Sequence, residues 1–288
     1  MNKHVLYLVT EDWYFISHRL NLALYCKREG YKVSVACSDT GKLSTLKKHG
    51  IRSYDVKWNR SSLSPISIVK EIYQIYRVIK LVKPDLIHVI SMRPIVLASI
   101  SKIFLPRIPT IFSFTGLGFV FVSSDFKSNL LRLAIKFYFC ILFRNKLNKI
   151  VVQNKDDKQY LSKYIYLPKS KINIIRGSGV DINYFRLLPE PSFPPIKIAY
   201  VGRLIEDKGI ENLIKGFKGA RSLYSGIELI LAGKLDIKNP TSLSLKRLNE
   251  IKKIKGIKYI GEVKDVRKIW KTVHIAILAS RREGLPMS

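Results

Sequence analysis

Short apolar runs rich in Val, Ile and Leu alternate with helical patterns along almost the whole chain. In the first half these runs are Val5–Val9, Val33–Cys37, Ile51–Val56, Leu86–Ile90, Thr110–Phe114, Ile150–Val152 and Ile172–Ile175. Helical patterns lie between them, including Ile16–Arg28, Leu43–His49 and Ile66–Val82. Strands joined through helices run parallel, and a parallel sheet needs helices on both faces. We therefore expect a doubly wound α/β fold.

A second series of strand–helix units begins after a proline-rich stretch. Leu188–Pro195 reads LPEPSFPP, which predicts a stiff extended linker. Four strand patterns follow, at Ile196–Val201, Ile227–Leu231, Ile257–Ile260 and Val273–Leu278. A doubly wound nucleotide-binding domain has about six strands, so we expect the second domain to be incomplete. The predicted organisation is a first domain over residues 1–187, a linker over 188–195 and a second domain over 196–288.

The stretch Ala199–Glu211, AYVGRLIEDKGIE, carries the clearest chemical signal. Gly202 permits a tight turn after the strand, and a helix opens near Lys208. A helix N-terminus suits a phosphate, because it offers free N–H groups and a positive dipole end. Arg203 and Lys208 add positive charge on either side of the loop, enough for a diphosphate without a metal. The alternative is an ordinary strand–helix turn with two solvated cations.

The net charge of +30 arises from 51 Lys and Arg against 21 Asp and Glu, and the excess is spread over both halves. It indicates an anionic partner such as a phospholipid surface, a phosphorylated substrate or nucleic acid. A coding bias toward Lys and Ile is the alternative explanation. We expect no nucleic-acid partner, because no recognition motif or basic stripe is evident.

The cysteines indicate the compartment. Cys26, Cys37 and Cys140 lack metal-like spacing, which favours a reducing compartment over a disulfide scaffold. The N-terminal residues read as a first strand and not as a signal peptide. We therefore expect a cytoplasmic protein.

Four blocks of the second half resemble one family in their order and spacing. They are GRLIEDKG, LAGK at Leu231–Lys234, YIGEVKD at Tyr259–Asp265 and SRREGLP at Ser280–Pro286. Together they resemble the donor-binding half of glycosyltransferase family 4, and EDWYFISHRL, SFTGLGFVF and GSGVDINYF resemble its first domain. The resemblance covers nearly the whole chain. It implies the GT-B fold, in which two doubly wound, Rossmann-like domains flank a cleft.

The resemblance also implies a reaction and its residues. A sugar of hexosyl or N-acetylhexosaminyl type would move, with retention, from a UDP-linked nucleotide-sugar to an acceptor hydroxyl. Arg203 and Lys208 would hold the donor diphosphate, and Glu283 would contact the donor sugar. The other implied donor-binding residues are Gly202, Gly233, Lys234, Gly261, Glu262, Val263, Gly284 and Leu285. We expect no cofactor and no metal, since the chain contains no Asp-x-Asp pair.

The acceptor side is expected in the first domain, at Glu11, Trp13, His18, Thr115 and Gly116. The first three follow the first strand, at the sheet end where open α/β sheets bind ligands. Thr115 stands where many family members place a His, and a Thr is no general base at neutral pH. Retention in which the departing phosphate takes the proton needs no such base. For His18 a purely structural hydrogen bond is the alternative role.

The family pattern continues past Ser288. It pairs a Glu with a second Glu eight positions later, and the partner of Glu283 would fall at position 291. We expect an enzyme that acts on a lipid-linked intermediate of capsule, O-antigen or lipopolysaccharide synthesis. The alternative is an inactive or split-gene fragment of such an enzyme, which would be a non-catalytic binding module or need a separate C-terminal piece.

A location on the inner face of the cell membrane is expected from the helix Asn129–Leu147. Its apolar part, Leu130–Phe143, is too short to span a bilayer and contains cations, which suits an interfacial position on an anionic membrane. The alternative is a helix packed into the protein core.

Overall fold

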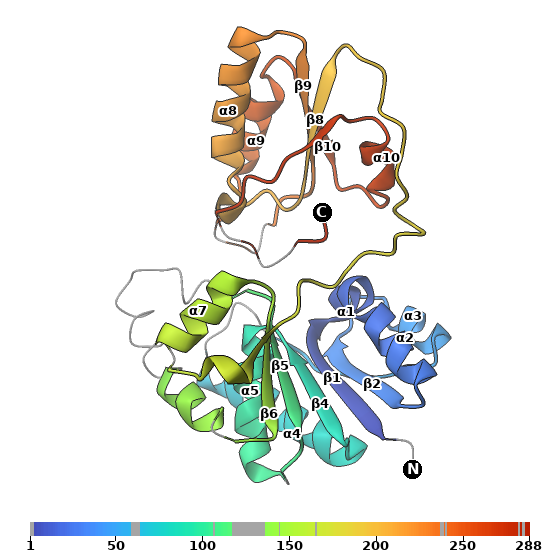
Figure 1. The fold of residues 1–288 in the computed structure, drawn as a ribbon, viewed down its shortest axis with the longest axis vertical. Helices are drawn as coiled ribbons and strands as arrows, with labels where there is room; N and C mark the ends of the chain where they lie inside the picture. Colours follow the sequence, from blue (N-terminus) through green and yellow to red (C-terminus); the bar gives the residue numbers. More distant parts are fainter. Residues whose placement is uncertain are drawn as a thin grey trace. The chain divides into compact units, whose positions relative to one another are not determined.

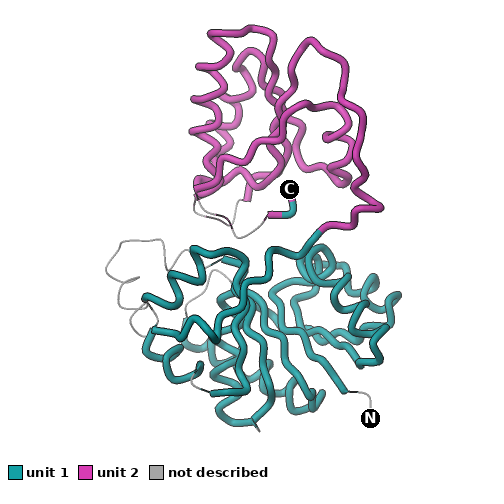
Figure 2. Tube along the Cα trace, in the orientation of Figure 1, with its two compact units in different colours: residues 1–179, 287 teal, residues 180–286, 288 magenta. Residues whose placement is uncertain are grey.

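The computed structural model describes residues 3–58, 64–105, 107–116, 136–143, 145–164, 166–236, 239, 241–281, 283 and 286–288. It divides into two compact units, residues 1–179 with Met287 and residues 180–286 with Ser288 (Figure 2). Residues 180–187, which the sequence assigns to the first domain, group with the second unit. One reason is that Tyr184 stacks on the guanidinium of Arg267, whose Cζ lies 3.6 Å from the ring centroid.

The sheet of unit 1 has seven strands in the order β3-β2-β1-β4-β5-β6-β7, and all its described pairings are parallel (Figure 1). The strands are β1 His4–Glu11, β2 Lys32–Ser38, β3 Arg52–Asp55, β4 Leu86–Ile90, β5 Thr110–Phe114, β6 Asn148–Val152 and β7 Ile172–Ile174. Each corresponds to a predicted apolar run, so the expected parallel sheet is confirmed.

Helices cover both faces of this sheet. They are α1 Asp12–His18, α2 Leu20–Arg28, α3 Leu43–Lys48, α4 Pro65–Val82, α5 Met92–Ser101 and α7 Lys155–Tyr164, with 3₁₀ turns at Lys102–Phe104 and Lys169–Lys171. Leu6 and Leu8 of β1 belong to the core cluster of α4 and α5, whereas Val5 and Tyr7 belong to that of α1 and α2. This alternation along one strand is what two covered faces require.

The predicted helix Ile16–Arg28 is two helices that meet at Arg19, which has φ −132° and ψ −11°. The first begins earlier than predicted, at Asp12. The buried carboxylate of Asp12 accepts hydrogen bonds from the backbone N–H groups of Trp13, Thr40 and Lys42 at 2.6, 2.9 and 2.8 Å. Burial would raise the pKa of Asp12, but these bonds and that of the Thr40 hydroxyl outweigh it and lower the pKa.

The predicted interfacial segment is only partly described, because residues 129–135 lie outside the described ranges. Residues 136–142 are helical. Phe139 and Phe143 are buried in the core beside Phe112 and Phe114, while Phe137 is 70% exposed. The described part of this segment is therefore anchored in the core. Among the described helices, none is long and apolar enough to cross a bilayer.

Unit 2 contains a smaller parallel sheet in the order β10-β9-β8-β11. Its strands are β8 Ile196–Val201, β9 Ile227–Ala232, β10 Ile257–Gly261 and β11 Ile275–Ala276. Its helices are α8 Ile210–Leu223, α9 Leu245–Lys252 and α10 Arg267–Trp270, and a 3₁₀ turn covers Glu206–Lys208. The four predicted strands are present, and β11 lies at one edge of the sheet. The two α/β units with a smaller second sheet agree with the predicted fold class.

Candidate functional site

Three glycines bring the strand ends of unit 2 together. Gly202, Gly233 and Gly261 lie at the carboxyl ends of β8, β9 and β10. The N–H of Gly202 donates to the carbonyl of Ala232 at 2.9 Å, and the N–H of Gly233 donates to that of Gly261 at 2.7 Å. Gly233 has φ +151°, and a Cβ there would lie 1.8 Å from the carbonyl oxygen of Gly202. Only glycine allows this approach, which places three loops at one edge of the sheet.

A fourth glycine, Gly209, brings the chain after β11 to the same edge. It has φ +69°, and a Cβ there would lie 2.0 Å from the carbonyl oxygen of Ala279. The backbone N–H of Arg281 donates to the carbonyl of Asp207 at 3.1 Å. These contacts hold Ala279 and Arg281 against the turn that precedes α8.

As a result, Lys208 and Glu283 form an ion pair although they are far apart in the sequence. Both side chains are largely buried, with 23% and 19% of their surface exposed. Tyr200 is buried near Glu283. Burial and then the charge of Glu283 raise the pKa of Tyr200, whose hydroxyl donates to the carbonyl of Arg203 at 2.9 Å.

The other cations at this edge are also paired with carboxylates. Arg203 contacts Asp236 at 2.9 Å, Lys234 contacts Glu262 at 3.1 Å and Arg281 contacts Glu206 at 3.4 Å. These pairs are exposed, and an exposed ion pair is worth about 0–1 kcal/mol. An anion can therefore replace any of these carboxylates at little cost. Within the described residues, the loops at this edge thus bring Arg203, Lys208, Lys234 and Arg281 together.

The structure thus gathers most of the predicted donor residues at one edge. Val263 lies in the loop after β10 and packs against the cluster of α10. Gly284 and Leu285 lie outside the described residues. The sequence analysis missed Gly209, Tyr200 and Asp236. Gly209 directly follows Lys208, so it carried a usable signal, whereas nothing in the sequence marks Asp236 as the partner of Arg203.

The predicted acceptor residues lie at the carboxyl edge of the unit 1 sheet. Glu11 ends β1, Trp13 is 42% exposed, and the hydroxyl of Thr115 lies 3.3 Å from that of Ser91. Gly116 has φ +140° with open space around it.

His18 sits differently from these residues. It stacks on Tyr14 at 4.4 Å and its Nδ1 lies 2.6 Å from the hydroxyl of Ser17. Burial and then the charge of Arg19 lower its pKa. These contacts fit the structural role that the sequence left open.

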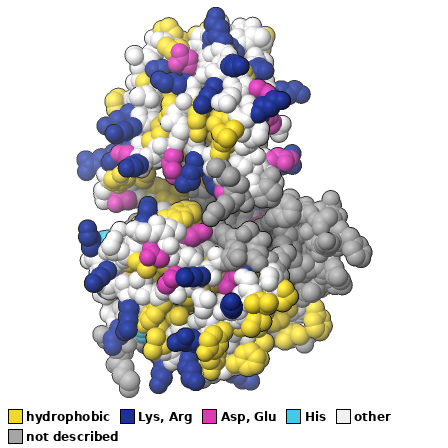
Figure 3. All heavy atoms as spheres, turned by 180° about the vertical axis from the view of Figure 1, so that it is seen from behind, with side chains coloured by type: hydrophobic (Ala, Val, Ile, Leu, Met, Phe, Trp, Pro, Cys, Tyr) yellow, Lys and Arg dark blue, Asp and Glu magenta, His cyan; other side chains and the backbone are white. Residues whose placement is uncertain are grey.

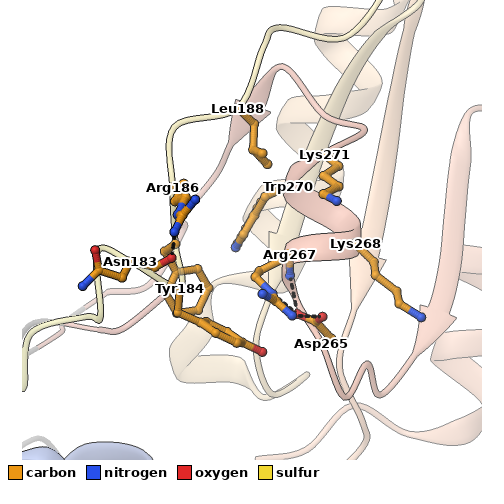
Figure 4. A pocket seen from close by; sticks show the side chains of 10 residues that line it. Asn183, Tyr184, Arg186, Leu188, Asp265, Arg267, Lys268, Trp270 and Lys271 are labelled. Carbon is orange, nitrogen blue, oxygen red and sulfur yellow. Dashed lines mark hydrogen bonds and ion pairs between the residues drawn. The ribbon is translucent and has the colours of Figure 1, made fainter.

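A hollow of about 530 Å³ in unit 2 contains none of the predicted residues. Segments 183–188 and 265–271 line it (Figure 4). Among the basic side chains that line it, Arg267 is committed to Asp265 through contacts of 2.9 and 2.7 Å and to the ring of Tyr184. No group of three or more His, Cys, Asp or Glu that could hold a metal occurs within the described ranges.

Two sequence families match the chain. The family described as Glycosyl transferase 4-like matches residues 4–154, and that described as Glycosyl transferases group 1 matches residues 190–288.

Two curated relatives are 23% identical to this chain. One is the N,N'-diacetylbacillosaminyl-diphospho-undecaprenol alpha-1,3-N-acetylgalactosaminyltransferase of Campylobacter jejuni, aligned over 84% of this chain and 65% of its own length. The other is the UDP-Gal:alpha-D-GlcNAc-diphosphoundecaprenol alpha-1,3-galactosyltransferase of Escherichia coli, aligned over 90% of this chain and 68% of its own length. The chain spans about two-thirds of the length of these relatives.

Solved structures with similar folds include a glycosyltransferase from Rickettsia africae, with a TM-score of 0.72, 20% identity and coverage of 97% of this chain and 73% of that one. The Anabaena protein HepE in complex with UDP and glucose gives a TM-score of 0.70, 17% identity and coverage of 97% and 75%. At these identities the likeness concerns the fold alone.

Proposed function

The chain belongs to glycosyltransferase family 4, whose members have the GT-B fold and transfer sugars with retention, and on this premise we propose that it uses a UDP-sugar as donor and a lipid-linked saccharide as acceptor. The proposed role is the synthesis of a surface polysaccharide. The donor would bind at the glycine-rich edge of unit 2, and the acceptor would bind through unit 1.

The ion pair of Lys208 and Glu283 is the observation that carries this proposal. A nucleotide-sugar presents a diphosphate beside a sugar with several hydroxyl groups. The donor edge offers a cation and a carboxylate side by side, which suits these two chemical groups. The diphosphate would replace Glu283 at the ammonium of Lys208, and the freed carboxylate would accept a hydrogen bond from the sugar.

In the reaction, the bond between the sugar and the diphosphate breaks and negative charge grows on the phosphate oxygen. Lys208 and Arg203 would stabilise this charge, because fixed cations act most strongly where charge develops in the transition state. The acceptor hydroxyl would give its proton to the departing phosphate oxygen. No side-chain base is then needed, which is compatible with Thr115 on the acceptor side.

The names of two relatives mention diphospho-undecaprenol acceptors, and one solved relative binds UDP and glucose. These names support a UDP-sugar and a lipid-linked acceptor for this chain. A lipid-linked acceptor requires the protein to reach a membrane.

The outer face of α4 supports such a peripheral position. It exposes Ile66, Val69 and Tyr73 by 70%, 63% and 58%, and Lys70 and Arg77 are exposed beside them. Figure 3 shows hydrophobic side chains gathered between Lys and Arg on the face of unit 1 turned to the viewer. Apolar side chains among cations suit an anionic membrane surface, and we propose that the protein binds the inner face of the cell membrane.

Titration of UDP by calorimetry tests the donor site. Lys208→Ala should weaken UDP binding at least about tenfold, because a charged hydrogen bond is worth about 1.5–3 kcal/mol. Arg203→Ala should weaken it less, since this side chain is half exposed. Lys215→Ala, on the exposed side of α8, is the matched control and should leave the affinity unchanged. Unchanged UDP affinity in both site variants would remove the assignment.

Turnover is measured separately, as UDP released from a panel of UDP-sugars in the presence of prenyl-diphosphate-linked acceptors. The anomeric configuration of the product reports retention. UDP binding without turnover on any of these acceptors would favour the non-catalytic alternative.

A further inference from the structure

Two tyrosines extend from strands of unit 2 toward the loops of its glycine-rich edge. Tyr200 of β8 and Tyr259 of β10 both pair in register with Leu231 of β9, so the three residues form one row across the sheet. Residues paired in this way project from the same face of the sheet. This face is the one that α8 and α9 cover, because Tyr200 and Leu231 belong to the core cluster of these helices and Tyr259 packs against it (Figure 1).

Tyr200 anchors the loop that follows β8. The residue is 1% exposed, and its hydroxyl donates to the carbonyl of Arg203 at 2.9 Å. This path needs a glycine at position 202, because a Cβ at Gly202 would lie 2.8 Å from the hydroxyl oxygen of Tyr200. Burial raises the pKa of Tyr200, so the hydroxyl keeps its proton and remains a donor. The bond therefore ties the backbone of Arg203 to the buried core.

Tyr259 anchors the loop that follows β9 in the same way. Its hydroxyl donates to the carbonyl of Gly233 at 2.9 Å. The N–H of Gly233 donates to the carbonyl of Gly261 at 2.7 Å, so β10 holds both polar groups of this glycine. Lys234 follows directly, and its carbonyl accepts a hydrogen bond from the N–H of Leu204 at 3.3 Å. The two loops are thus joined to each other as well as to the tyrosines.

The carbonyls that these hydroxyls reach belong to the backbone that carries two cations of the edge. One is the carbonyl of Arg203 itself, and the other directly precedes Lys234. The side chains of these cations are 53% and 63% exposed, and exposed ion pairs do little to fix them. A buried tyrosine hydroxyl needs an acceptor, and here both acceptors are loop carbonyls at the edge. The tyrosines therefore anchor the backbone from which each cation extends.

We propose that Tyr200 and Tyr259 are positioning residues, whose hydroxyls hold the loops of Arg203 and Lys234 in the arrangement that receives the donor diphosphate. The role rests on the donor site proposed above and adds two residues that act through its cations. Without these bonds the loops would have to become ordered when the ligand binds, which costs free energy.

Amide hydrogen exchange of the full chain without ligand tests whether the hydroxyls order the loops. Tyr200→Phe should speed exchange at residues 202–205, and Tyr259→Phe at residues 233–235, by at least about threefold, since each variant loses one hydrogen bond. Exchange in the middle of β9 should stay unchanged. Tyr224→Phe is the matched control, because this tyrosine is 46% exposed in the connection between α8 and β9. Equal acceleration throughout unit 2, or no acceleration in either loop, would overturn the proposal.

Calorimetric titration of UDP tests the consequence for the donor site. Each of the two variants should weaken UDP binding about 3–10-fold, and Tyr224→Phe should leave it unchanged. Tyr200→Phe made in an Arg203→Ala background should weaken the binding by less than about twofold, because the cation that Tyr200 positions is then absent. A purely structural role of Tyr200 would give the same loss in both backgrounds.

Two outcomes distinguish the positioning role from the donor site itself. If the parent binds UDP and both folded variants keep its affinity, or the loss is the same in the Arg203→Ala background, the positioning role is overturned and the donor site stands. If the parent does not bind UDP, the donor site is removed. The exchange measurement, which needs no ligand, then decides whether the hydroxyls order the loops.

Discussion

Gly233 shows how a single residue fixes the geometry of the glycine-rich edge of unit 2. Its backbone conformation and its approach to the carbonyl of Gly202 both exclude a side chain. Gly233→Ala should lower the free energy of unfolding of unit 2 by about 1–3 kcal/mol and weaken UDP binding. Gly219→Ala is the control, since a Cβ at this α8 position meets open space and should stabilise by about 0.5–1 kcal/mol. Urea unfolding of both variants measures the two effects, and equal stability of Gly233→Ala and the parent would contradict the close approach.

Replacing Glu283 should change the affinity for UDP in the opposite direction to replacing Lys208. In this structure its carboxylate holds the ammonium of Lys208 and therefore competes with a diphosphate. Glu283→Gln should strengthen the binding of UDP about 3–10-fold, because it frees Lys208 and removes a negative charge. The same variant should lower the rate of sugar transfer, because Glu283 is proposed to contact the donor sugar. UDP has no sugar, so its binding does not depend on that contact. Calorimetry with UDP and the turnover assay separate the two effects, and weaker UDP binding would argue against competition at Lys208.

At the residue level, motif resemblance identified Arg203, Lys208 and Glu283 as candidates. It could not identify their partners, because Asp236 and Glu206 lie on loops whose paths depend on the whole sheet. Arg19 was also beyond prediction. The sequence analysis placed it within one continuous helix, whereas this helix breaks at Arg19.

The helices and strands of the chain were largely predictable, and the differences have local causes. The apolar runs identified the strands of both sheets because parallel strands are buried on both faces. The start of α1 was misjudged because its anchor, Asp12, receives hydrogen bonds from Thr40 and Lys42 in a distant loop. β11 is shorter than its apolar run, since only Ile275 and Ala276 pair with β8.

The outer face of α4 carries the prediction for membrane binding. Replacing Ile66, Val69 and Tyr73 with Ser should reduce partitioning onto anionic vesicles at least about tenfold, since burying one large apolar side chain is worth about 1.5–3 kcal/mol. Leu223→Ser at the end of α8 is the control, because this side chain is 90% exposed but lies in unit 2. Co-sedimentation with neutral and anionic vesicles, at low and high salt, measures the effect. Equal loss in the control, or equal binding to both kinds of vesicle, would contradict a basic and apolar docking face.

The net charge of the whole molecule also contributes to membrane binding. The excess of positive charge is spread over both halves, so general attraction to anionic lipids does not by itself select one face. Selection must come from apolar side chains, whose contribution salt does not screen. The residual binding at high salt is therefore the part that α4 should explain.

The two units contain separate hydrophobic cores, and this leads to a prediction for the intact chain. Each hydrophobic cluster of the described residues draws its members from one unit. A ligand that binds only the folded form stabilises its own unit, by about 2.7 kcal/mol when its concentration is 100 times the dissociation constant. Saturating UDP should therefore slow amide hydrogen exchange in β8, β9 and α8, and leave β4 and β5 unchanged. Exchange measured by mass spectrometry on the full chain decides this, and equal slowing of exchange in β4 and β5 would contradict a separate stabilisation of unit 2.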